Sequence, residues 1–127
     1  MCATWFLDAA SDGATGSVLP LADGAFHIAR GHVLDLSGWA VIDGNHAEPR
    51  AMFWRWDRER EQVVMYPLKR EDVAAKAHDP SRLFSGFFAP LETRGRALGL
   101  HRLTFFLVPS DAGSACWDDR PIMVVIT

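Results

Sequence analysis

The sequence predicts an all-β domain, an antiparallel β-sandwich of about seven or eight strands with one short helix. Two observations support this class. Apolar residues recur at period two in short runs, and turn-forming clusters separate these runs at intervals of about eight to fifteen residues. The repeated crossover helices that an α/β fold needs are missing from the pattern.

The clearest strand runs from Val33 to Ile42 and ends at Asp43-Gly44-Asn45. Two more strands, residues 51–57 and 62–68, predict a hairpin around the charged residues 58–61. That turn lacks the Gly or Asn that tight hairpin turns favour. The remaining strands are expected at residues 83–90, 101–108 and 121–127, with short edge strands at 17–21 and 25–29.

One segment favours a helix, the alanine-rich residues 71–78, which Asp79-Pro80 terminates. Residues 1–16, which include ASDGATGS, predict a flexible N-terminal segment. Residues 17–127 then form a single sandwich domain. The chain has 127 residues, 49% of them apolar, which is enough for one hydrophobic core without staples.

Composition excludes several classes of function. A net charge of −3 gives no basic footprint for nucleic acid. No run approaches the roughly 18 apolar residues of a membrane helix, so membrane insertion is not expected. The start, MCATWFLDAASDG, lacks the basic and apolar regions of a signal peptide, which favours the cytoplasm or a piece excised from a longer chain. Cys2 and Cys116 either form a disulfide, if the termini meet, or remain two free thiols, as such an isolated pair favours.

No residue pattern indicates catalysis, a metal or a cofactor. The five histidines show no HxH, HxxH or HExxH spacing. The acidic residues fall in turns, where they are usually only solvated, and neither a GxSxG elbow nor a phosphate-binding glycine loop occurs. We therefore expect a protein that is not an enzyme.

Aromatic residues are more informative, since the chain has five tryptophans and eight phenylalanines. The segment MFWRWD, residues 52–57, is divided by the pleat of its strand. Its outward face carries Phe53 and Arg55, which are candidates for contact with a ligand or partner. Trp117 falls in a loop and is the third candidate. The inward face is expected to carry Met52, Trp54 and Trp56.

Four segments, in the right order over about residues 31 to 108, resemble those of immunoglobulin-like modules found beside bacterial glycosyltransferases and other polysaccharide-processing proteins. LDLSGWAVID, residues 34–43, resembles the family's "l-x-l-x-GWa-x-d" strand. REDVA, residues 70–74, resembles the "R-x-DVa" start of its short helix, and Ser85-Gly86-Phe87 its "sGF" strand. LGLHRL, residues 98–103, is similar to "l-x-x-G-x-H-x-l", with one extra residue between Gly99 and His101.

This resemblance implies an immunoglobulin-like fold and a non-catalytic accessory or binding module that contacts glycan or a neighbouring glycosyltransferase domain. The resemblance does not identify any residue of this chain as a ligand-binding residue. We expect Gly38 to let a backbone or ring approach closely, Trp39 to pack, and Arg70 to pair with Asp72 or hold a loop carbonyl. The alternatives are a structural domain that assembles with a partner or as a homo-oligomer through an exposed sheet face or edge, and, third, a carboxylate-dependent hydrolase.

Overall fold

The computed structural model describes residues 3–42, 49–109, 116–117 and 120–127, with the backbone alone at 49–50, 109 and 116–117. Its strands form two sheets, ordered β1-β3-β7-β6 and β2-β10-β8-β4-β5, and β9 pairs with β8. The elements are β1 (Ala3–Asp12), β2 (Phe26–Ile28), β3 (Val33–Ile42), β4 (Pro49–Trp56), β5 (Gln62–Val63), β6 (Met65–Lys69), α1 (Glu71–Ala77), the 3₁₀ turn η1 (Pro80–Arg82), β7 (Phe84–Glu92), β8 (Gly99–Pro109), β9 (Cys116–Trp117) and β10 (Ile122–Ile126).

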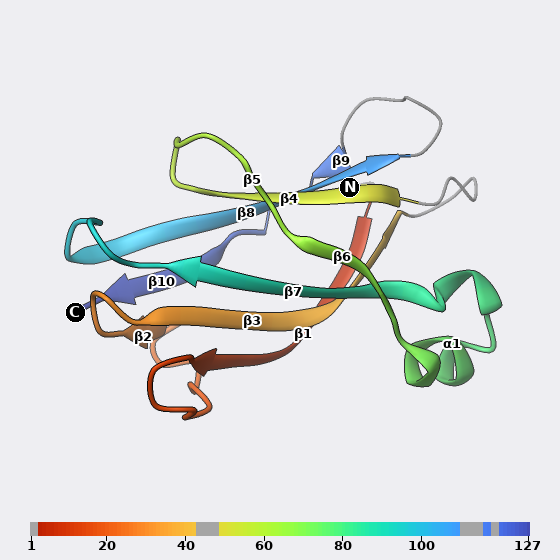
Figure 1. Ribbon diagram of the computed structural model, residues 1–127, viewed down its shortest axis with the longest axis horizontal. Coiled ribbons are helices and arrows are strands. Elements are labelled where there is room, and N and C mark those ends of the chain that lie inside the picture. Colours follow the sequence, from red (N-terminus) through yellow and green to blue (C-terminus); the bar gives the residue numbers. More distant parts are fainter. Residues whose placement is uncertain (1–2, 43–48, 110–115, 118–119) are drawn as a thin grey trace.

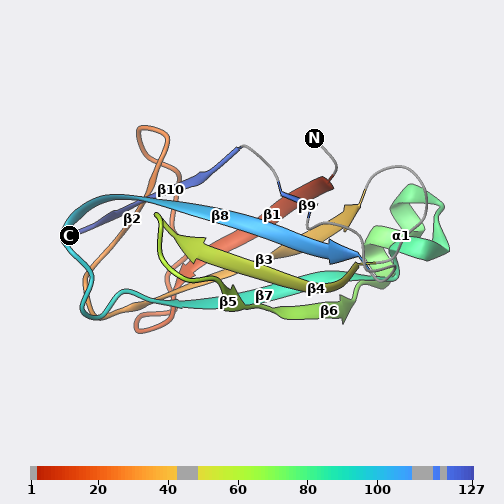
Figure 2. The ribbon, with the colours of Figure 1, turned by 90° about the horizontal axis from the view of Figure 1, so that it is seen from above.

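The two sheets lie in layers with the hydrophobic core between them (Figure 2). The predicted inward faces are confirmed. Met52, Trp54 and Trp56 of β4 are at most 2% exposed. They pack against the inward row of β3, where Leu34, Leu36 and Ala40 are fully buried. The chain is therefore an all-β, sandwich-like domain, and its described residues hold a single α-helix, α1. None of the helices in the described part is long and apolar enough to cross a membrane.

The expectation of a flexible N-terminal segment over residues 1–16 is wrong for residues 3–12. These residues form β1, which pairs antiparallel with β3 at the edge of the four-stranded sheet. The pairing passes from Leu7 opposite Gly38 to Ala9 opposite Ser37, so Asp8 is the extra residue of a β-bulge. The bulge reverses the alternation along the strand, which hides the period-two signal from the sequence.

The predicted strand 62–68 is divided between the two sheets. β5 pairs with β4, as the predicted hairpin requires, but β6 pairs with β7 in the other sheet. Between them lies Val64, which is 2% exposed and belongs to the core. Burial of this side chain marks the point where the chain crosses from one layer to the other.

The short edge strands are confirmed in part. β2 forms, but it pairs parallel with β10, so the fold is not wholly antiparallel. Residues 17–21 contribute only an isolated bridge between Val18 and Ser11.

The predicted helix is confirmed as α1, which lies between β6 and β7 at one end of the sandwich (Figure 1). His78 caps its C-terminus in the left-handed conformation, with φ of 51°. Asp79 then caps η1 by accepting hydrogen bonds from the backbone and hydroxyl of Ser81. Together α1 and η1 form a short lobe against the end of the four-stranded sheet.

Candidate binding pocket

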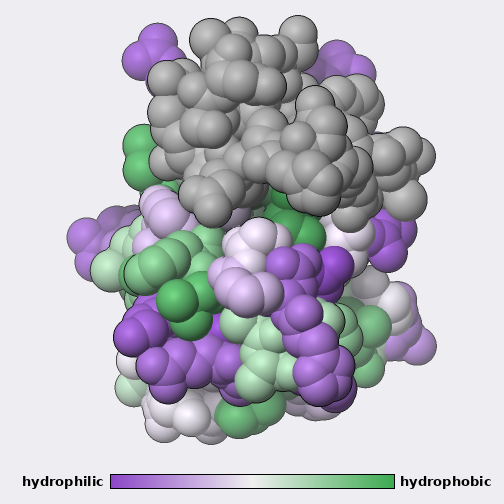
Figure 3. Space-filling model, turned by 90° about the vertical axis from the view of Figure 1, so that its right-hand side faces the viewer, coloured by the Kyte–Doolittle hydropathy of each residue, from purple (hydrophilic) through white to green (hydrophobic). Residues whose placement is uncertain are grey.

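A pocket of about 350 Å³ lies between this lobe and the outer face of the four-stranded sheet. β1 and β3 supply one wall, and α1 with its flanking residues supplies the other. Figure 3 faces this end of the molecule, where hydrophilic and hydrophobic residues lie side by side outside the grey region. The lining residues are Phe6, Asp8, Trp39, Arg70, Asp72, Val73, Lys76, Ala77 and Arg82.

The sheet side of the pocket is aromatic. Phe6 and Trp39 are cross-strand neighbours on β1 and β3, and their rings are nearly parallel, 23° apart, with centroids separated by 6.4 Å. Phe6 is 56% exposed, which is unusual for so large an apolar side chain. The Arg82 guanidinium lies 5.5 Å from the centre of the Trp39 ring, a cation–π distance. The pocket therefore has an accessible aromatic wall with a cation at its edge.

Arg70, the residue before α1, organises the polar side of the pocket. Its Nε and Nη2 donate to the two carboxylate oxygens of Asp72, at 2.9 and 2.7 Å. Its Nη1 donates to Asp8 at 2.6 Å and to the backbone oxygen of Gly38 at 3.3 Å. The expected pairing of Arg70 with Asp72 is thus confirmed, whereas the carbonyl that it holds belongs to strand β3 and not to a loop. Hydrogen bonds from Arg70 lower the pKa of Asp72 to about 2, although burial opposes this shift.

Two glycines bring these parts close together. A Cβ at Gly38 would lie 2.0 Å from the Phe6 carbonyl oxygen and 3.0 Å from the Phe87 ring, so both a backbone and a ring approach it as expected. A Cβ at Gly86 would lie 2.7 Å from Cγ of Arg70. Three of the four segments that carry the family resemblance thus meet at Arg70.

The residues singled out from the sequence lie elsewhere, in the six-stranded sheet, where Phe53 and Arg55 are on the outer face of β4. Phe53 is half-buried and pairs with Phe106 of β8 and Val63 of β5. The Arg55 guanidinium lies 5.0 Å from the centre of the Phe106 ring and 3.7 Å from the carboxylate of Glu61. Its Nε is buried and has no hydrogen-bond partner among the described residues. Arg55 therefore contacts Phe106 and Glu61 within the fold and does not line the pocket.

Trp117 belongs to β9 rather than to a loop, and its backbone pairs with Phe106. Its side chain lies outside the described part of the structure. The register thus places Phe53 and Arg55 on β4 and Trp117 on β9, two strands that both pair with β8, and none of the three lines the pocket.

Sequence reasoning missed Phe6, Asp8 and Arg82 as pocket residues. Phe6 and Asp8 fell within the segment expected to be flexible. Arg82 follows the predicted helix with no periodic signal. The "R-x-DVa" segment was the available signal, because it indicated that Arg70 pairs with Asp72 or with a backbone carbonyl.

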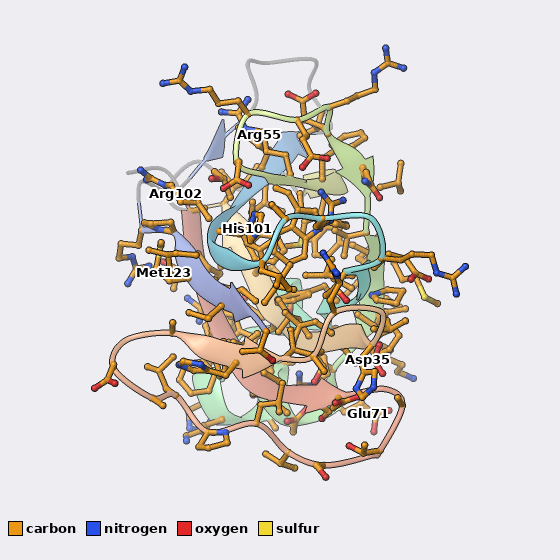
Figure 4. The ribbon with its side chains drawn as sticks, turned by 90° about the vertical axis from the view of Figure 1, so that its left-hand side faces the viewer. Asp35, Arg55, Glu71, His101, Arg102 and Met123 are labelled. Carbon is orange, nitrogen blue, oxygen red and sulfur yellow. The ribbon has the colours of Figure 1, made fainter. Side chains whose placement is uncertain are left out.

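A second polar cluster lies at the opposite end of the sandwich, where Figure 4 shows His101 among the side chains near the β7–β8 connection. His101 Nδ1 lies 2.7 Å from a carboxylate oxygen of Asp57, and Nε2 lies 2.7 Å from the carbonyl oxygen of Ala97. Burial opposes the charge on His101, but these two acceptors outweigh it and raise its pKa.

Asp57 is held from a second side as well. Burial would raise its pKa, but the backbone N–H of Arg102 donates to its other oxygen at 2.9 Å, and with His101 this lowers the pKa of Asp57. Because both nitrogens of the ring and both oxygens of the carboxylate have partners inside the fold, the cluster ties loops together rather than binding a ligand.

Within the described residues no group of three or more His, Cys, Asp or Glu side chains is arranged to hold a metal ion. The disulfide alternative for Cys2 and Cys116 lies outside the described residues and side chains. Comparison with protein-family models, with curated proteins and with solved structures finds no match to this chain. A function for this chain is therefore inferred from the geometry of the pocket.

Proposed function

We propose that the chain is a non-catalytic, immunoglobulin-like binding module that contacts glycan in bacterial surface polysaccharide metabolism, alone or beside a glycosyltransferase domain. The observation that carries the proposal is the pocket with the exposed Phe6 ring next to Trp39. Small-ligand sites occupy about 300 to 1,000 Å³ and combine apolar walls with a few placed polar groups. At about 350 Å³ the pocket has room for a small part of a glycan chain.

The chemistry of the pocket suits a sugar. An aromatic wall stacks against the C–H face of a pyranose, and hydroxyl groups need charged or polar partners around the ring. Arg70, Asp8 and Asp72 form a preorganised network in which each charge is already oriented. Binding then needs little reordering of side chains, which reduces its entropic cost.

The same network argues against the hydrolase alternative. A glycosidase requires one carboxyl group that stays protonated near neutral pH and donates a proton to the leaving oxygen. Asp72, whose pKa is lowered to about 2, cannot fill that role, and Asp8 is paired with the same guanidinium. Among the pocket residues this leaves no carboxylic acid to start the reaction.

The proposal is tested with an array of bacterial polysaccharides followed by calorimetric titration of any glycan that binds. Phe6→Ala should weaken binding about tenfold, since it removes a stacking surface of roughly 1 kcal/mol or more. Phe84→Ala is the matched control, because Phe84 is similarly exposed, at 58%, but does not line the pocket. An array without a hit, or equal losses for the two variants, would contradict the proposal.

Assembly through the six-stranded sheet is the second candidate function. Val63 is 74% exposed and lies beside Phe53, which continues an apolar row to Phe106. A second copy of the chain could cover this row. Light scattering over a concentration series would then show a dimer that Val63→Lys converts to a monomer, whereas a constant monomer mass rules this function out.

A further inference from the structure

We infer that the pocket selects an acidic sugar, one that carries a carboxylate or sulfate group, through Lys76 and Arg82. This inference rests on the proposed function and adds the class of glycan. It follows from which of the charged groups in the pocket already have partners and which retain free hydrogen-bonding capacity.

The acidic groups of the pocket are already used. Asp72 accepts two hydrogen bonds from Arg70, and Asp8 accepts one at 2.6 Å. All three guanidinium nitrogens of Arg70 donate hydrogen bonds, to these carboxylates and to the carbonyl of Gly38. These three side chains shape the pocket but offer little new charge to a ligand.

The two basic side chains on the α1–η1 lobe, Lys76 and Arg82, retain N–H groups that are free to form hydrogen bonds. Lys76 lies on the exposed side of α1 and forms no ion pair with any described residue. Arg82 has only a long contact, 3.7 Å from its Nε to a carboxylate oxygen of Asp79. Asp79 itself accepts shorter hydrogen bonds from Ser81. The unsatisfied capacity in the pocket therefore consists of cationic N–H donors.

The placement of these donors fits a charged sugar. Arg82 lies over the Trp39 ring, and Lys76 lines the same pocket from α1. A pyranose stacked on the aromatic wall would carry its acidic substituent toward the α1–η1 lobe, where charge-assisted hydrogen bonds from Lys76 and Arg82 can receive it. A neutral sugar would offer Lys76 and Arg82 only hydroxyl oxygens, which form weaker hydrogen bonds than a charged acidic group does.

The test is calorimetric titration with tetragalacturonate, with its fully methyl-esterified form and with a sulfated galactan oligosaccharide of the same length. At about 0.15 M salt we expect at least one acidic oligosaccharide to bind about tenfold more tightly than the neutral ester. The carboxylate and sulfate arms show which acidic group is preferred. Equal binding of the acidic and neutral forms would overturn the inference and leave the proposed function intact. If none of these oligosaccharides binds and the polysaccharide array also shows no binding, both the inference and the proposed function are overturned.

Lys76→Gln should reduce affinity for the acidic oligosaccharide about tenfold and leave affinity for any neutral glycan unchanged. Lys69→Gln is the matched control, because Lys69 is paired with Glu71 at 3.1 Å and does not line the pocket. Arg82 is the poorer choice of variant, since its loss also removes packing on Trp39. Equal reduction by the two lysine variants would indicate attraction to overall charge and would overturn the inference.

Discussion

Replacing Gly38 with alanine should force β1 away from β3 at the wall of the pocket. The new Cβ would lie 2.0 Å from the Phe6 carbonyl oxygen, and contacts below 3.0 Å are essentially never observed, so β1 must move by about 1 Å. Movement in the other direction is blocked because the Phe87 ring already lies at that 3.0 Å limit. Overpacking of this kind costs about 1 to 3 kcal/mol, and we expect about 3 kcal/mol because strand pairing is disturbed as well.

Gly95→Ala separates the steric effect from backbone strain. Gly95 has φ of 77°, and a Cβ there would meet no atom within 4 Å, so this variant should cost only the left-handed conformation, about 1 kcal/mol. The free energy of unfolding of both variants is measured by guanidinium denaturation. The dependence of this free energy on denaturant concentration should be the same in both, so that a change in midpoint reports a change in stability. If Gly38→Ala costs no more than Gly95→Ala, the close approach at Gly38 does not organise the pocket.

Three further variants test other parts of the structure. Arg70→Lys keeps the charge but cannot bond both aspartates and a carbonyl at once, so amide hydrogen exchange across residues 71–77 should accelerate about tenfold; unchanged exchange would refute the anchoring role of Arg70. His101 has a raised pKa, so its contribution to the free energy of unfolding is full below about pH 6.5 and is lost as pH rises through the higher folded-state pKa. His101→Gln should therefore flatten the decline in stability as the pH rises above about 6.5, and denaturation midpoints that fall equally with pH in the two proteins would contradict this. Thr93→Val removes the acceptor that holds the Gly31 N–H at 2.8 Å and should destabilise the fold by about 1 to 3 kcal/mol in thermal or chemical unfolding, whereas a loss under 0.5 kcal/mol would show that water replaces the hydroxyl.

The parts of the fold that follow strict period two could be predicted from the sequence. β3 and β4 were placed correctly, with their inward faces, because Leu34, Leu36, Trp54 and Trp56 alternate with residues that tolerate solvent. Register of this kind depends only on the pleat and on which face is apolar.

Features that depend on one irregular residue could not be predicted. The bulge at Asp8 shifts the inward set of β1 from Trp5 and Leu7 to Ala10, so no single alternation describes the strand. At Val64 the chain crosses from one sheet to the other, but apolar residues lie on both sides of it in the sequence. The segment 62–68 therefore has the pattern of one continuous strand. In each case a tertiary contact, rather than local propensity, decides the backbone path.

The pocket was hidden for a related reason. Its aromatic wall comes from β1 and β3, whereas its cations come from α1 and η1, more than 30 positions further along the chain. Nothing in the spacing of Phe6 and Arg82 links them. Only the segment around Arg70 indicated a contact between the start of the helix and the rest of the fold. Its partner on β1, Asp8, is the extra residue of the bulge and could not be identified from the sequence.

The most direct test of the central claim, that the pocket between the α1–η1 lobe and β1–β3 is the ligand site, uses the indole N–H signals of the five tryptophans. A two-dimensional ¹⁵N correlation spectrum is recorded while the best glycan from the array is added, with each indole assigned by a Trp→Phe variant. The signal of Trp39 should shift in a saturable way, while those of the buried Trp54 and Trp56 stay in place. Saturable shifts confined to Trp117 would move the binding site to the six-stranded sheet and contradict the claim.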